Sequence, residues 1–442
     1  MSSEHNVKIP AAELFAAGIF LVYAALLLFR TAPPSLTDYA DWTYQGVLLR
    51  NHVLGIADPF HQLKHYPVPN STETVGIAVF ALLCSWKLAA KLWLCVQLGF
   101  SFFTLRALVR TSGAAWPIWI IAPAALFFNV SFWYGFMNFQ FGLCWVLWFT
   151  AMLLMRVRSS AGEESGWQWP LALVLIAAFF THMIPCAFCG LLLLAYSVQT
   201  RRWRVLINLA PVFVLTLWYI AGRFLLEGNA DGQTYMQETA KPFTPAFFAF
   251  KANTWLKSFG SVNPHGWNVI FFGHTIFLLL FVLNFVLACI VLLCFLRSVR
   301  QGIRRGNELR FFWASVLLLV PFVLLLPGKA LGVSDPGARL LQTVLAPTLV
   351  LLVRRDDLWM KLASIASLAL SLAGLVLFQH FAFSSHYSSA QQPPKWPRAL
   401  LSFTLIPNDD QDLFYRALER GDLTLEVFPT GMLLNRHAGP RP

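Results

Sequence analysis

The sequence is poor in charged residues. Asp, Glu, Lys and Arg make up 12% of its 442 residues, whereas soluble globular proteins carry about 25%. In their place, apolar runs of about 20 residues, the length that crosses a bilayer as a helix, recur from end to end. This composition excludes an ordinary soluble enzyme. It predicts an all-α polytopic membrane protein surrounded by a lipid bilayer.

Motifs of soluble nucleotide-dependent enzymes are also missing. The chain has no G-x-x-x-x-G-K-[ST] and no strand followed by G-x-G-x-x-G, so we expect no nucleotide-binding domain. We find no internal repeat of the transporter kind. The net charge of +12 does not indicate a nucleic-acid partner, because the basic residues cluster between apolar runs, as the positive-inside rule explains. The seven cysteines lie in apolar segments, which favours packing over redox or metal chemistry.

The apolar runs predict about eleven transmembrane spans. Segment 75–86 is only about a dozen residues long, so we expect it to lie at the interface or to re-enter, although its crossing stays open. With a cytoplasmic N-terminus, this arrangement puts every basic cluster inside, as the positive-inside rule requires. The predicted spans are residues 11–29, 91–109, 115–132, 135–155, 168–181, 184–199, 205–225, 269–296, 311–327, 339–353 and 359–382.

The same orientation puts the longer polar segments outside. These are the loops 30–74, 226–268 and 328–338 and the tail 383–442. We therefore expect a transmembrane domain over 1–382 and a small extracytoplasmic C-terminal region over 383–442. In the tail, "DDQDLFYRALERGD" predicts a short helix and "LTLEVF" a strand. Loops on a rigid scaffold commonly carry function, so a site is expected on the outer side.

The first outer loop carries a pair of acids in "TDYADWTYQG". Asp38 and Asp41 are three residues apart, so they share one face of a helix. Tyr39, Trp42 and Tyr44 suit a helix lying at the membrane interface. The pair is either a solvated face near a helix N-terminus or a carboxylate base or metal ligand at the outer surface.

Further polar residues lie near the same edge. In "HQLKHYPVPNSTET", His61 and His65 could share a metal if the segment were helical, but no third ligand is near. Asn70 opens a sequon that one chance match would explain, and Asn138 lies in the aromatic turn "FFNVSFWYGFMNFQFG". We keep these four residues as candidates for substrate binding and assign no metal ligands.

Three basic or titratable residues complete the set. His182 stands at a helix break before Pro185, where it binds either a ligand or a backbone carbonyl. Lys329 and Arg339 lie in "PGKALGVSDPGARL". Arg339 opens a span from the outside, against the positive-inside trend. Its guanidinium would either bind a phosphate bidentately or snorkel to the lipid head groups.

The stretches "TDYADW", "HYPVPN", "FWYGFMNFQFGL" and "FFTHMIPCAFCGLLLLAYS" resemble a poorly characterised group of bacterial membrane proteins. The overall plan resembles the GT-C superfamily of integral-membrane glycosyltransferases, which use polyprenyl-phosphate-linked sugars. The resemblance implies an acidic base or metal ligand in the first outer loop, matched by Asp38 and Asp41, although the common Asp-Glu dipeptide is absent. It also implies a cation that holds the donor phosphate, for which Arg339, Lys329 and His182 are the candidates.

The resemblance implies an inverting reaction in which a sugar passes from a polyprenyl-phosphate donor to a lipid- or glycan-linked acceptor. Such a reaction needs no nucleotide-linked donor. The carboxylate takes the acceptor's proton and the cations stabilise the departing phosphate. A divalent metal is compatible but not required. The expected location is the bacterial inner membrane, with the site and the C-terminus in the cell envelope. Two alternatives remain: another lipid-handling enzyme or glycan ligase, and a transporter or non-catalytic subunit.

Overall fold

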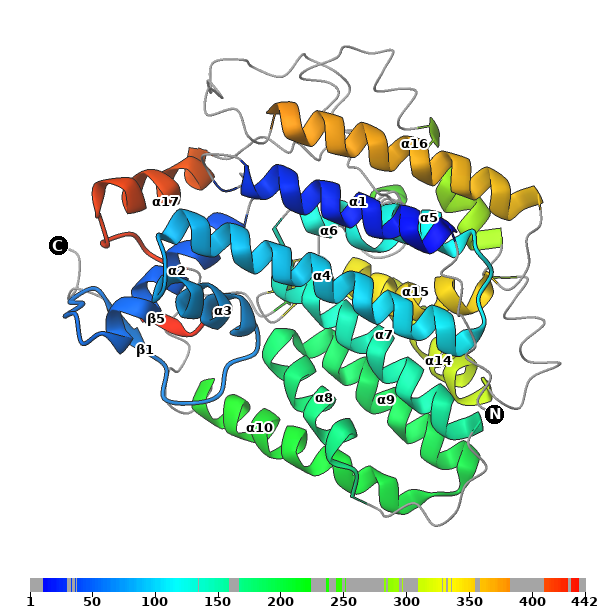
Figure 1. The fold of residues 1–442 in the computed structure, drawn as a ribbon. Helices are drawn as coiled ribbons and strands as arrows, with labels where there is room; N and C mark the ends of the chain where they lie inside the picture. Colours follow the sequence, from blue (N-terminus) through cyan, green and yellow to red (C-terminus); the bar gives the residue numbers. More distant parts are fainter. Residues whose placement is uncertain are drawn as a thin grey trace, which may run out of the picture.

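The structure, a computed structural model, is a helical bundle with a smaller unit at one end (Figure 1). It describes residues 11–29, 38–133, 135–158, 167–223, 309–327, 336–353, 358–381, 409–427 and 431–436, with single residues and short pieces at 33, 36, 236–237, 244–248, 251, 282–283, 285–293, 296, 329–330 and 333–334.

Long apolar helices form the bundle, as the composition predicts. They are α1 (Ala11–Leu28), α4 (Trp86–Ser112), α7 (Met137–Arg158), α8 (Trp169–Thr181), α9 (Met183–Thr200), α10 (Ala210–Ala221), α14 (Arg310–Leu325), α15 (Pro336–Leu352) and α16 (Leu358–Phe381). Five described segments are long and apolar enough to cross a membrane: Ala11–Leu28, Trp86–Ser112, Met137–Arg158, Met183–Thr200 and Trp203–Ala221. This supports an integral membrane protein, and the count of about eleven spans stays a prediction.

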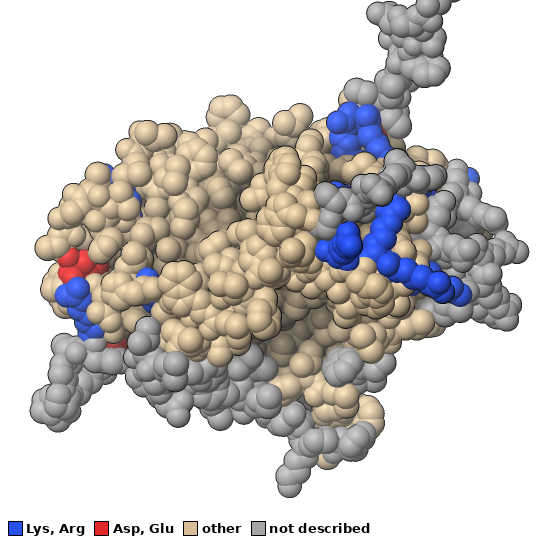
Figure 2. All heavy atoms as spheres, turned by 90° about the horizontal axis from the view of Figure 1, so that it is seen from below, with Lys and Arg blue, Asp and Glu red and all other residues tan. Residues whose placement is uncertain are grey.

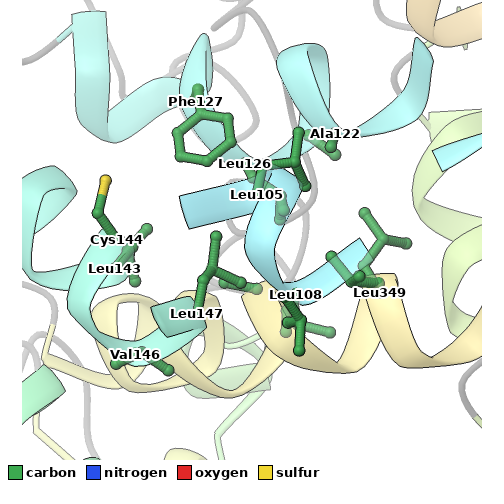
Figure 3. Packing of buried hydrophobic residues seen from close by; sticks show 14 of the residues in the cluster. Leu105, Leu108, Ala122, Leu126, Phe127, Leu143, Cys144, Val146, Leu147 and Leu349 are labelled. Carbon is green, nitrogen blue, oxygen red and sulfur yellow. The ribbon is translucent and has the colours of Figure 1, made fainter. Parts of the chain in front are cut away.

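The bundle core is built from leucine, small residues and aromatic rings. Figure 3 shows Leu105 and Leu108 of α4 packed among Leu143 and Leu147 of α7, with Leu349 of α15 closing the contact. Between α4 and α7, the chain forms α5 (Ile118–Ala122), the π-helical turn η1 (Pro123–Phe127) and α6 (Val130–Trp133). A π-helical turn inside a helix is uncommon and often marks a functional site.

The first outer loop folds against the bundle as α2 (Tyr39–Val53), β1 (His61–Leu63) and α3 (Thr72–Ala81). The ten residues of α3 rise about 15 Å, half the hydrocarbon thickness of a bilayer. One face of α3 exposes Val75 and Val79, whereas Glu73 and Thr74 are fully buried against α2 and α4. The helix therefore exposes apolar side chains and buries two polar ones together with Ile77 and Ala81.

The described part of the tail packs on this loop. Helix α17 (Asp409–Arg420) places Phe414 and Leu418 against Tyr44 and Leu48 of α2. Strand β5 (Leu433–Asn435) pairs antiparallel with β1, with Leu433 opposite Leu63. We call α2, α3, β1, α17 and β5 the loop unit. Figure 1 shows it gathered at one end of the bundle, so the tail is joined to the first loop rather than standing apart from it.

On the face seen in Figure 2, Lys and Arg are frequent toward one end of the molecule, and others lie beside acidic residues at the opposite end. Near the end of α4, Arg106 pairs with Glu13 of α1 at 2.6 Å and Arg110 pairs with it at 3.2 Å. Such an uneven distribution of charge is what the positive-inside rule would use to orient the chain.

A second small sheet joins segments far apart in sequence. Strand β2 (Met236–Gln237) pairs with β3 (Lys329–Ala330), which pairs with β4 (Val333–Ser334), all antiparallel. Strands β3 and β4 come directly before α15, whereas β2 lies before α14.

Candidate functional site

The site is assembled around Gly135 and Phe136, between α6 and α7, which we call the aromatic turn. Gly135 has φ of 76°, a conformation that favours glycine. A Cβ atom at this position would lie 2.7 Å from the backbone nitrogen of Tyr39 and 2.8 Å from that of Asp38. The turn therefore touches the first residues of α2 directly, and only glycine allows so close an approach.

Arg339 lies against the other side of this turn. Its Cζ is 4.0 Å from the centroid of the Phe136 ring and 5.8 Å from that of Phe139. A guanidinium stacked on aromatic faces is held by the ring quadrupole. Arg339 is in the first turn of α15, so the positive end of the helix dipole adds to its own charge. The site is consequently a region of concentrated positive potential.

Asp38 faces this potential from the start of α2. Burial raises the pKa of its carboxyl to about 7, while the positive charge of Arg339 acts to lower it. No hydrogen bond or ion pair of the Asp38 carboxylate is found among the described residues. The two charges therefore interact through space without direct contact. A carboxyl with a pKa near neutrality is suited to accept a proton.

His182 brings a second donor to Arg339. It begins α9, and its Nδ1 accepts a hydrogen bond from the backbone N–H of Ile184 at 3.2 Å. Its Nε2 lies 3.2 Å from Nη1 of Arg339. A neutral imidazole has one N–H, so with Nδ1 accepting, Nε2 carries the proton. Two N–H groups then meet, an arrangement that an oxyanion between them would satisfy.

Asp41 has different surroundings from Asp38, although the two are one turn apart. It is fully buried and accepts a hydrogen bond of 2.6 Å from Nε2 of Gln45. Gln45 in turn lies against Gly431 of the tail, with no room for a Cβ there. Asp38 thus experiences the charge of Arg339, whereas Asp41 is buried and bound to Gln45 inside the loop unit.

Asn138 and Asn70 are brought together by the fold. Asn138 accepts from the backbone N–H of Glu73 at 2.9 Å and donates to the carbonyl of Asn70 at 3.0 Å. These bonds tie the start of α3 to the start of α7. Their predicted role in substrate binding stays a prediction, but the contacts are those of a structural brace.

The two histidines of the loop do not form a pair. Residues 61–63 are a strand rather than a helix, so the four-residue spacing does not place His61 and His65 on one face. His61 is bound by Asp58 at 3.0 Å and by the carbonyl of Leu425 at 2.8 Å, whereas His65 is exposed. The idea that this segment is a helix, on which a metal shared by His61 and His65 depended, was wrong. Within the described ranges, no three His, Cys, Asp or Glu residues converge on a metal-sized site.

Some residues of this region could not be named from the sequence. Gln97 donates to Oε2 of Glu73 at 2.9 Å and to the carbonyl of Met137 at 3.3 Å. Burial raises the pKa of Glu73 well above its usual value, while the hydrogen bond from Gln97 acts to lower it. Phe136 was visible only as part of an aromatic stretch. Lys329 belongs to β3, and its side chain lies outside the described residues.

Comparison with known proteins does not assign the chain to a family. No family model, no curated protein and no solved structure matches it. The chemistry of the site is therefore argued from the convergence of Asp38, His182 and Arg339.

Proposed function

We propose that the protein is a membrane glycosyltransferase that moves a sugar from a polyprenyl-phosphate donor to an acceptor hydroxyl at the extracytoplasmic face, as the resemblance to the GT-C superfamily implies. The observation that carries the proposal is the placement of Asp38 opposite the Arg339–His182 pair. Three segments distant in sequence supply these groups. Asp38 is the proton acceptor, and Arg339 and His182 donate hydrogen bonds to an anion. Inverting glycosyl transfer needs this division of roles.

In the proposed reaction, Asp38 accepts the proton of the acceptor hydroxyl. The acceptor oxygen forms a bond to the anomeric carbon, and the bond from that carbon to the phosphate oxygen breaks. The electron pair of the broken bond stays on the polyprenyl phosphate. Arg339 and His182 stabilise this developing charge by N–H donation, the guanidinium being held in place by Phe136.

Two features support a lipid-linked rather than a nucleotide-linked donor. The sequence lacks the usual nucleotide-binding motifs, and the site lies where apolar helices meet the loop unit. Arg339 begins the apolar helix α15, so a phosphate carried on a lipid would reach it from the bilayer. Asp41 is assigned a structural role rather than that of the base, because it is fully buried and its carboxylate accepts a hydrogen bond from Gln45.

The proposal is tested with the purified full chain in lipid nanodiscs and farnesyl phosphate as a short donor-lipid probe. We expect Arg339→Lys to weaken binding of this probe by about tenfold or more, because lysine keeps the charge but loses the planar fork. The matched control is Arg50→Lys in α2, whose Nη1 binds the neighbouring Asn51. Equal binding by both variants and the unmodified protein would contradict the assignment of Arg339.

Transfer itself is followed with radiolabelled polyprenyl-phosphate sugars extracted from membranes. Label should leave the lipid fraction with the unmodified protein. With Asp38→Asn we expect transfer to fall by about 100-fold or more while farnesyl phosphate still binds. A variant that retains full transfer would remove Asp38 from the role of base.

A further inference from the structure

A buried hydrogen bond joins the aromatic turn to the helix that carries Arg339. Ser131 of α6 donates from Oγ to Oε1 of Gln342 at 2.6 Å, and both side chains are buried. Gln342 is one turn beyond Arg339 on α15. The backbone carbonyl of Ser131 also accepts the N–H of Phe136 at 2.9 Å. Ser131 therefore holds Phe136 with its backbone and α15 with its side chain.

A second buried pair, Gln140 and Asn129, braces the aromatic turn from α7. Gln140 of α7 donates from Nε2 to Oδ1 of Asn129 at 2.5 Å, and that same oxygen lies 3.3 Å from the N–H of Phe132. Asn129 donates in turn to the carbonyl of Leu126 in η1 at 3.0 Å. The amides of Asn129 and Gln342 also line one small cavity in an otherwise apolar wall. The turn is thus braced by polar groups on both sides.

Polar pairing of this kind selects one register between two helices. Apolar side chains pack in several sliding positions at similar cost. A buried donor or acceptor that loses its partner costs about 1–3 kcal/mol, so the Ser131–Gln342 pair disfavours any shift of α15 along the turn. No reacting group touches either residue among the described contacts, which points to positioning rather than chemistry.

The aromatic turn is the element that contacts both sides of the site. It touches the backbone of Asp38 through Gly135 and supports Arg339 through Phe136. We propose that Ser131 and Gln342 are positioning residues that set the separation between the Asp38 carboxylate and the Arg339 guanidinium. This inference rests on the proposed function for its biological meaning, but the separation itself can be measured without any transfer assay.

The experiment uses the pKa of Asp38 to report its separation from Arg339. Because Arg339 acts to lower the pKa of Asp38, displacing Arg339 should move the titration of Asp38 to higher pH. For each background, the melting temperature of the full chain in nanodiscs is measured from pH 5 to 9 with and without Asp38→Asn. The difference between the two curves levels off above the native pKa of Asp38. We take the pH of this bend as the native pKa and call it the Asp38 midpoint. Within the described part of the chain, Arg339 is the charged group that acts on this carboxyl.

We expect Gln342→Leu and Ser131→Ala to raise this midpoint by about half a pH unit or more, and to weaken binding of farnesyl phosphate. Ser131→Thr keeps the hydroxyl donor for Gln342 without adding a charge and should keep most of the midpoint. The control is Thr348→Val on the same helix, because the buried Thr348 hydroxyl bonds only within α15, to the carbonyl of Val344. Ser131→Ala is the milder change and serves if Gln342→Leu does not fold.

The outcomes separate the two proposals. An unchanged midpoint in Ser131→Ala would overturn the positioning role, whatever the enzyme does. A raised midpoint in a protein that shows no transfer would support positioning and count against the proposed function. An equal rise in Thr348→Val would also overturn the inference, because any loosening of α15 would then have the same effect.

Discussion

The guanidinium of Arg339 stacks on Phe136 with its Cζ 4.0 Å from the ring centroid. The flat ring restricts the guanidinium to a plane, and His182 meets it at one edge. A cation at the start of a helix is opposed by the helix dipole, so the ring and an incoming anion both offset that cost. The aromatic turn is therefore as much a part of the candidate site as the charged residues.

Phe136→Leu tests the stack. Leucine keeps the apolar contact but loses the quadrupole, which contributes about 0.5–2 kcal/mol to such a pair. We expect the dissociation constant for farnesyl phosphate to rise about 3- to 20-fold, with a small change in melting temperature. Phe103→Leu serves as the control, since Phe103 is an exposed ring of α4 that contacts Trp148. Unchanged affinity in Phe136→Leu would show that the ring does not hold the cation in its binding position.

Asp38→Asn should alter stability as well as activity. The native pKa of Asp38 is raised to about 7, above the unfolded value near 4. Between these values the native state binds more protons than the unfolded state, so the contribution of Asp38 to stability falls as pH rises through this window. We expect Asp38→Asn to be more stable than the unmodified protein at pH 8, by up to about 4 kcal/mol for the three-unit difference in pKa, and to lose this advantage by pH 4. A constant difference across the range would mean that Asp38 is not ionised in a dry site.

Transfer should depend on the same ionisation. The base acts in its deprotonated form, so activity should rise with pH through about 7 and level off above it. The rising limb is measured as kcat/KM over pH 5 to 9, where the free enzyme's groups are reported. A profile that is flat from pH 5 to 8 would assign the base to another residue.

Gly135→Ala tests the approach of the aromatic turn to α2. The new Cβ would lie 2.7 Å and 2.8 Å from two backbone nitrogens, and backbone atoms cannot move as a flexible side chain can. Gly113→Ala is the matched control, because Gly113 also has a positive φ of 67° but has nothing within 4 Å. We expect about 1 kcal/mol of destabilisation in the control and clearly more in Gly135→Ala, measured by thermal melting. Equal losses would mean that the contact with Asp38 is loose.

Tyr44→Phe tests the attachment of the tail to the first loop. The Tyr44 hydroxyl donates to the carbonyl of Asp422 at 3.3 Å and accepts the N–H of Leu425 at 3.1 Å. Losing both bonds should cost about 1–3 kcal/mol, and limited proteolysis should cut the tail several-fold faster. Tyr219→Phe, which removes a hydroxyl bonded to Arg223 on α10, should leave that rate unchanged. If both variants are cut at the same rate, the tail is held by its apolar face alone.

The charged residues of the site could be predicted from the sequence, but the contacts that hold them in place could not. Asp38, His182 and Arg339 stood out because each lies where a helix begins or breaks, and unusual charge at such a place is visible in one sequence. The stack on Phe136 and the Ser131–Gln342 bond join segments distant in the chain, and nothing local encodes which partners meet. The choice between Asp38 and Asp41 also depended on such contacts.

The errors have the same cause. His61 and His65 fit a helix by spacing, but residues 61–63 pair as a strand with Leu433–Asn435. The stretch "LTLEVF" fitted a strand, yet its described residues up to Val427 are not in a strand, and the strand of the tail lies further on. Short strands are chosen by the partner available to them, which lies at the far end of the chain here.

The pairing of β1 with β5 also sets an order of events during synthesis. His61 and Leu425 are 364 residues apart, which at about 5–20 residues per second is an interval of roughly 20–70 s. Throughout that time the first loop stands without the strand and the apolar helix face that cover it. The first loop is therefore completed by a segment made long after it, and a chain that lacks residues 409–436 would expose Tyr44 and Leu48.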